Sequence, residues 1–258
     1  CVAEVVGTYL LVLFGTGSVA AAVLTGAQVG LWQVAVVWGF GITLAIYATA
    51  AISGAHLNPA VSLSFAIFRR DEFPVNRLLP YWISQMVGGV LGGLTILWLF
   101  GSFITEFEAV QGLVRGEPGS QLSAMVFGEY FPNPAVFGTD EAARSLISPA
   151  KALVVEASVR PPQRGLPTKH LAPFFIGFTV AALISLFAPL TQAGWNPARD
   201  FGPRIVAYLA GWDAIAIPGP SSGFWVYIIG PLIGGPIGAA VHEFILGPLR
   251  KRQAEEAE

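Results

Sequence analysis

Charged side chains are scarce in this sequence. Asp, Glu, Lys and Arg make up only 12% of its 258 residues and hydrophobic residues 54%, whereas a soluble domain carries roughly 25% charged residues. Cys1 is the single cysteine, so an intramolecular disulfide is excluded and no metal site is expected. The net charge of −2 offers no basic surface to a nucleic acid. The composition predicts an integral membrane protein without a cofactor.

The apolar residues form long runs. We expect membrane spans at residues 2–24, 31–52, 78–103 and 225–249, because about 20 apolar residues cross a hydrocarbon core of roughly 30 Å. Two of these runs carry glycines four residues apart, which lets helix backbones approach closely, and we favour this packing role over a gating role. The chain begins without Met and inside an apolar run, which is typical of a fragment.

Two polar segments interrupt the apolar runs. In SGAHLNPAVS, residues 53–62, Asn58 can cap a helix and Pro59 fits its first turn. This helix continues to Phe68 and is about 15 Å long, half of a bilayer core. The second segment, GWNPARDFGP at residues 194–203, opens another short helix that continues through Tyr208. Two half-span helices predict an inverted-repeat channel or transporter with helix N-termini that meet near the membrane midplane.

The motifs AHLNPAV and WNPARDFGPR together resemble those of the aquaporin family, and of its glycerol-facilitator branch in particular. The resemblance extends from Cys1 to about Pro248. It implies an all-α membrane protein: an inverted-repeat bundle of six spans plus two half-helices. We expect one channel domain over residues 1–258, with a first repeat at 1–103, an outer loop at 104–144, a second repeat at 145–249 and a cytoplasmic tail at 250–258.

The same resemblance implies the function. A member of this branch is a passive channel for glycerol, other small uncharged solutes and water, which excludes ions and protons and forms a homotetramer with one pore per subunit. An ion-coupled transporter is the alternative, but the spans hold few of the acidic residues that it needs. A non-conducting product of a damaged gene is a third reading. An enzyme is not expected, because the sequence shows no nucleophilic side chain paired with a general base.

The resemblance also assigns the pore residues. Asn58 and Asn196 are expected to offer side-chain amides to the pore. The two half-helices should meet through the other residues of the motifs, Pro59, Ala60, Pro197 and Ala198. The selectivity filter should comprise Trp38, Ile184, Ala193 and Arg199. The facilitator branch usually has a second aromatic residue at the position of Ala193 and a glycine at that of Ile184, and Trp195 or Phe187 could replace the missing ring.

Several polar residues are expected to support the pore. His56 resembles the pore-lining histidine of the family. Glu4 and Glu156 should bind the backbone of the loops that precede the half-helices. Asp200 and Arg204 match the facilitator branch, although opposite charges at i and i+4 are also typical of a plain stabilising pair, and both readings stay open.

Three other polar motifs have ordinary explanations. His170 and His242 lie near span ends, where we expect them to be interfacial or solvated. A third Asn-Pro-Ala, at residues 133–135, lies in the polar outer loop, and we expect an ordinary turn there.

Charge predicts the orientation. Basic residues gather at positions 69–77, 160–169 and 250–252, whereas acidic residues dominate the loop from 105 to 144. The positive-inside rule places the basic segments and the C-terminal tail in the cytoplasm and the acidic loop outside. We expect the protein in the plasma (inner) membrane.

This orientation requires a full span between the outer loop and the second basic segment, and the sequence is too short for one. Residues 145–157 hold about ten apolar residues, or roughly 15 Å of helix. Glu4 precedes Asn58 by 54 positions, whereas Glu156 precedes Asn196 by only 40, so about 14 residues are missing after Glu156. We expect a truncated fourth helix, an irregular connection to His170 and a groove beside it, in a chain that folds poorly alone.

Overall fold

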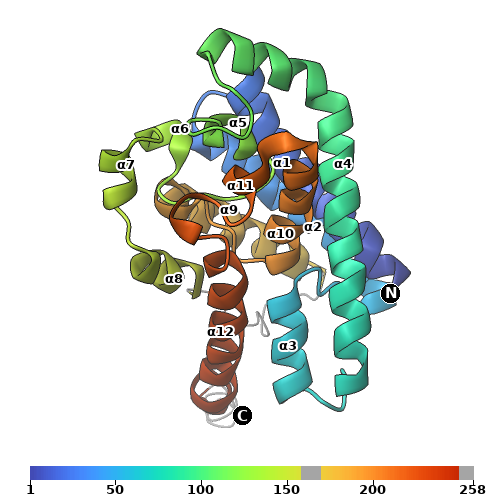
Figure 1. The fold of residues 1–258 in the computed structure, drawn as a ribbon. Coiled ribbons are helices and arrows are strands. Elements are labelled where there is room, and N and C mark those ends of the chain that lie inside the picture. Colours follow the sequence, from blue (N-terminus) through green and yellow to red (C-terminus); the bar gives the residue numbers. More distant parts are fainter. Residues whose placement is uncertain (158–169, 250–258) are drawn as a thin grey trace.

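The computed structural model describes residues 1–157 and 170–249, and every regular element in these ranges is a helix (Figure 1). Five helical segments of the described chain are long and apolar enough to cross a membrane. Their helices are α1 (Val2–Thr25), α2 (Leu31–Ser53), α4 (Leu78–Gln111), α9 (Ala172–Thr191) and α12 (Val226–Val241). The predicted all-helical membrane fold is confirmed, although α4 continues past residue 103, where we expected the span to end.

Two short helices begin at the predicted motifs. These are α3 (Pro59–Phe68) and α10 (Pro197–Ala207). Asn58 caps α3, because its side chain accepts a hydrogen bond from the backbone N–H of Ala60, and each helix has a proline in its first turn. At 1.5 Å per residue each is roughly 15 Å long, about half of a hydrocarbon core. The chain therefore contains the two predicted half-helices.

The fourth membrane helix of the bundle is short in the described part of the chain. Helix α8 (Pro149–Ala157) has nine residues, or about 14 Å of rise, against 24 residues in α1, its counterpart in the first repeat. In Figure 1, α8 lies beside only the upper end of α12. The described part of this helix is thus too short to cross a membrane, and the expected irregular connection and groove fall on residues 158–169, outside the described residues.

Glycines set the close helix contacts of both repeats. A Cβ atom on Gly88 of α4 would lie 2.4 Å from the carbonyl oxygen of Val5 in α1, and one on Gly234 of α12 would lie 2.0 Å from that of Ala157 in α8. Such distances are too short for any side chain, so these glycines allow the backbones to touch. This geometry supports the packing role that we favoured.

The remaining elements are short turns of helix. They are η1 (Val75–Arg77), α5 (Gln121–Ala124), α6 (Pro134–Phe137), α7 (Glu141–Ser145), η2 (Tyr208–Trp212), α11 (Asp213–Ala216), η3 (Pro220–Ser222) and η4 (His242–Leu246).

The predicted outer loop is not a solvated connection throughout. Residues 120–134 are almost all buried, since this segment folds back onto the end of α9 and the start of α10. Asn133 caps α6 and donates from its side chain to the carbonyl oxygen of Ala188 at 3.0 Å. The predicted turn is present as the single helical turn α6, but its asparagine also attaches the segment to α9, which we did not expect.

The two histidines near span ends differ. His170 is exposed, as expected. His242 is buried, with 8% of its surface exposed, so it is not solvated, and the interfacial position stays a prediction. Helix α12 continues through η4, within the predicted span of residues 225–249, and His242 is the first residue of η4.

Candidate pore and selectivity filter

The two loops that precede the half-helices have the same backbone conformation. Three residues of each loop have a left-handed backbone conformation: Gly54, Ala55 and Leu57 in the first, and Gln192, Ala193 and Trp195 in the second. Each residue of the first set is 138 positions from its counterpart, the same spacing as between Asn58 and Asn196. For a residue other than glycine this conformation costs roughly 1–2 kcal/mol. The loops therefore need partners that hold them.

In the first repeat this partner is Glu4, which is fully buried in α1. Its carboxylate accepts hydrogen bonds from the backbone N–H groups of His56 at 3.0 Å and Leu57 at 2.8 Å. The side chains of Ser53 and Gln85 donate to it at 2.6 and 2.7 Å. One carboxylate thus satisfies four donors and fixes the strained loop.

Glu156 does the same in the second repeat. It is fully buried at the end of α8 and accepts from the N–H groups of Gly194 at 3.1 Å and Trp195 at 2.6 Å. Thr191 donates its hydroxyl at 2.6 Å, as Ser53 does to Glu4. Glu156, in the described part of α8, therefore holds the second pore loop.

The two motif asparagines join the repeats. The side-chain amide of Asn58 donates to the carbonyl oxygen of Trp195 at 2.9 Å, and that of Asn196 donates to Leu57 at 2.8 Å. Each side-chain oxygen caps its own half-helix. Since a primary amide carries two N–H bonds, each asparagine keeps one N–H that can face the cavity described next.

A cavity of about 320 Å³ contains the predicted pore residues. All four filter candidates line it: Trp38, Ile184, Ala193 and Arg199. Both motif asparagines, Asn58 and Asn196, line it as well, together with His56 and Trp195. The guanidinium carbon of Arg199 lies 4.2 Å from the centre of the Trp38 ring, a cation–π contact. Trp195 lies on the cavity, while Phe187 packs edge-on against it at 6.1 Å. The structure thus brings the predicted filter residues together.

Sequence reasoning missed one residue beside the filter. Glu129, in the buried segment 120–134, forms an ion pair with Arg199 through its Oε1 atom. The sequence shows Glu129 only as one acid among several in the predicted outer loop. No local pattern could have singled it out, because the contact joins residues 70 positions apart.

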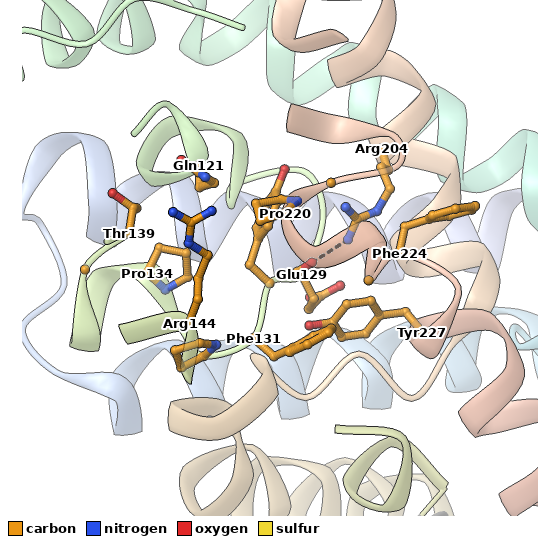
Figure 2. Close-up of a pocket in the computed structure, with 15 residues that line it drawn as sticks. Gln121, Glu129, Phe131, Pro134, Thr139, Arg144, Arg204, Pro220, Phe224 and Tyr227 are labelled. Atoms are coloured by element: carbon orange, nitrogen blue, oxygen red, sulfur yellow. Dashed lines mark hydrogen bonds between the residues drawn. The ribbon is translucent and has the colours of Figure 1, made fainter. Parts of the chain in front are cut away.

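Asp200 and Arg204 form the plain ion pair that we had left open, and it holds the segment 120–134. The two side chains are within 2.7 Å and essentially unexposed. Asp200 also accepts from the N–H of Glu129 at 2.7 Å. Figure 2 shows the second bond, in which Arg204 donates to the carbonyl oxygen of Glu129 at 2.5 Å. Asp200 and Arg204 therefore both fix segment 120–134 to α10.

The same segment is anchored at its next residue, Tyr130. Its N–H donates to the side chain of Gln192 at 2.8 Å, and its hydroxyl donates to the carbonyl oxygen of Ile215 at 3.0 Å. Burial raises the pKa of Tyr130 to about 12, so the hydroxyl remains a donor at neutral pH. This anchor fixes the loop over the second pore loop.

His56 lies on the cavity but is tightly held. Its Nδ1 lies 3.1 Å from the hydroxyl of Ser62, and its ring packs against Phe65, Phe73 and Tyr81 with centroid distances of 4.5 to 5.2 Å. Its ring orientation is therefore set by packing.

A second ion pair borders the cavity at the far end of α3. Arg69, the residue that ends α3, pairs with Glu243 of η4, and both side chains line the cavity. Phe68 and Phe244 pack edge-on beside it at 6.1 Å. These contacts hold the end of the first half-helix against the last span.

The fold and the site define a membrane channel built from an inverted repeat. The chain belongs to the major intrinsic protein family, whose model matches residues 1–242.

Two curated relatives are similar over nearly the whole chain. The glycerol uptake facilitator protein of Pseudomonas aeruginosa is 40% identical over 249 residues, which cover 95% of this chain and 88% of that protein. The propanediol uptake facilitator PduF of Citrobacter freundii is 38% identical over 249 residues, which cover 96% and 91%. Both are named as facilitators rather than as enzymes.

A solved structure supports the fold. The X-ray structure of the aquaglyceroporin from Plasmodium falciparum matches with a TM-score of 0.76 at 20% identity and covers 96% of both chains. The second repeat thus keeps the overall family arrangement despite its short fourth helix.

Proposed function

We propose that this protein is a passive membrane channel for glycerol, other small uncharged solutes and water, and that it excludes ions and protons. The observation that carries the proposal is the single cavity that Arg199, Trp38 and the two motif asparagines share. The facilitator names of the relatives agree with it.

The mechanism rests on the two ends of this site. At the filter, Trp38 offers an apolar wall to the carbon backbone of a polyol, while Arg199 can donate to its hydroxyl groups. At the meeting point of the half-helices, each N-terminus carries roughly +0.5 charge. The two charges repel cations, and the free amide N–H groups of Asn58 and Asn196 orient a passing oxygen atom.

The remaining assignments belong to the same proposal. The chain is one channel domain of two repeats, with residues 250–258 as a cytoplasmic tail in the plasma (inner) membrane. The basic residues at positions 69–77, 160–169 and 250–252, set against the acidic loop at 105–144, support this orientation. The many exposed apolar side chains on the spans, such as Trp98, Leu186 and Leu209, provide surface for lipid and for the contacts of a homotetramer.

Glycerol should pass through the protein at least as readily as water. The reason is the apolar ring of Trp38 opposite a hydrogen-bond donor, which suits a molecule with one apolar and one polar side. Stopped-flow light scattering on proteoliposomes measures both fluxes, with sucrose as the impermeant control. Strong water flux without glycerol flux would contradict the expectation.

Replacing Arg199 with valine should admit cations or protons. The change removes the positive charge from the filter and leaves the buried Glu129 carboxylate without its ion-pair partner, so cation conductance should rise at least about tenfold. Electrophysiology of the folded variant measures this leak. A correctly folded variant with no added conductance would show that Arg199 does not exclude ions.

A further inference from the structure

Hydrogen bonds to its backbone hold Glu129 beside Arg199 of the filter. Asp200 accepts from its N–H and Arg204 donates to its carbonyl oxygen, at 2.7 and 2.5 Å. Arg204 also bonds Asp200 and the carbonyl oxygen of Ala216. The peptide groups on both sides of Glu129 are thus fixed to α10, the helix that carries Arg199, so its side chain has little freedom to leave.

The carboxylate and the filter guanidinium are both removed from solvent. Their side chains are 1% and 7% exposed, respectively. Arg199 is the one ion-pair partner of Glu129 among the described residues. Its second oxygen, Oε2, is buried without a hydrogen-bond partner in the described part of the chain. The charge of Glu129 is therefore compensated mainly by Arg199.

Each of the two ion pairs beside the filter is neutral by itself. Asp200 and Arg204 neutralise each other, as their mutual ion pair shows. Glu129 likewise neutralises Arg199, so the cation that lines the cavity has an anion paired with it. The other filter side chains, Trp38, Ile184 and Ala193, are apolar and add no charge.

We infer that Glu129 is a specificity-determining residue of this channel, which sets the charge of the filter by pairing with Arg199. The inference rests on the proposed function, in that the cavity is taken as the conducting path. The paired filter rejects ions of both signs, since neither charge is free to stabilise an ion that has lost its water. Removing either partner leaves the other charge buried and uncompensated.

The sign of the leak should therefore depend on which partner is removed. Glu129→Gln keeps the side-chain shape and leaves Arg199 positive, so it should favour small anions such as chloride. Arg199→Val leaves Glu129 negative and should favour potassium. The double variant restores neutrality and should return the anion-to-cation permeability ratio toward that of the unchanged protein.

Reversal potentials in planar bilayers under a potassium chloride gradient measure this ratio for the protein and the three variants. Each single variant should change it by at least about tenfold, in opposite directions. Glu117→Gln, which alters an exposed acid of the same loop, is the matched control and should change nothing. A Glu129→Gln variant with no anion conductance, or a double variant as cation-permeable as Arg199→Val, overturns the inference.

A second measurement does not depend on conduction. The melting temperatures of the same four proteins form a double-mutant cycle. If Glu129 and Arg199 are paired, the double variant should lose less stability than the sum of the single variants, and additive losses refute the pair. Glycerol flux of the unchanged protein is measured in parallel, because its absence would refute the proposed function while the melting cycle still tests the pair.

Discussion

Replacing Glu156 with alanine is expected to prevent the second pore loop from folding and to abolish solute flux. The carboxylate is fully buried and accepts from Thr191, Gly194 and Trp195. A buried donor without a partner costs roughly 1–3 kcal/mol, so the loss of three bonds should exceed about 3 kcal/mol. The yield of folded protein and its melting temperature in detergent measure the loss, and stopped-flow assays measure the flux.

Three controls make this test specific. Glu141→Ala changes an exposed acid in α7 and should have little effect. Glu4→Ala removes the counterpart in the first repeat and should be as damaging. Glu156→Gln keeps one acceptor oxygen and should lie between the alanine variant and the unchanged protein. A stable, conducting Glu156→Ala protein would refute the role that we assign to this residue.

Lengthening the fourth helix should have the second large effect, in the opposite direction. Inserting 14 apolar helix-forming residues directly after Ala157 restores the spacing of the first repeat and brings α8 close to the length of α1. The longer helix can span roughly 30 Å and satisfy its backbone internally, which a bilayer requires. The folded yield and the melting temperature should both rise.

The position of the insertion is the control. The same 14 residues placed between Gly138 and Thr139, at the surface of the loop before α7, lengthen the chain equally but extend no span. They should leave the melting temperature unchanged or lower it. Equal behaviour of the two insertions would mean that the missing length of the fourth helix does not limit stability.

Local sequence patterns predicted the fold and the positions of the two half-helices. Asn58 with Pro59 and Asn196 with Pro197 could be read as helix starts because caps and first-turn prolines act within a few residues. The shortfall after Glu156 could be read from spacing alone. These features depend on the chain near each residue, and the structure has the corresponding helices where the sequence predicted them.

Long-range contacts explain what the sequence did not predict. Glu129 reaches Arg199, and Asn133 reaches Ala188, only because segment 120–134 folds back over the second pore loop. His242 lies within the predicted last span and is buried all the same. Each of these outcomes depends on which elements meet in space, and composition and periodicity do not encode that.

The reciprocal bonds of Asn58 and Asn196 have a consequence for biosynthesis. They join residues 137 and 139 positions apart, so neither pore loop has its partner until both repeats have entered the membrane. A ribosome that has delivered only the first repeat has inserted helices but no conduit. We therefore expect the pore to form only after the second repeat has been inserted, so that the partly translated chain forms no open channel in the membrane.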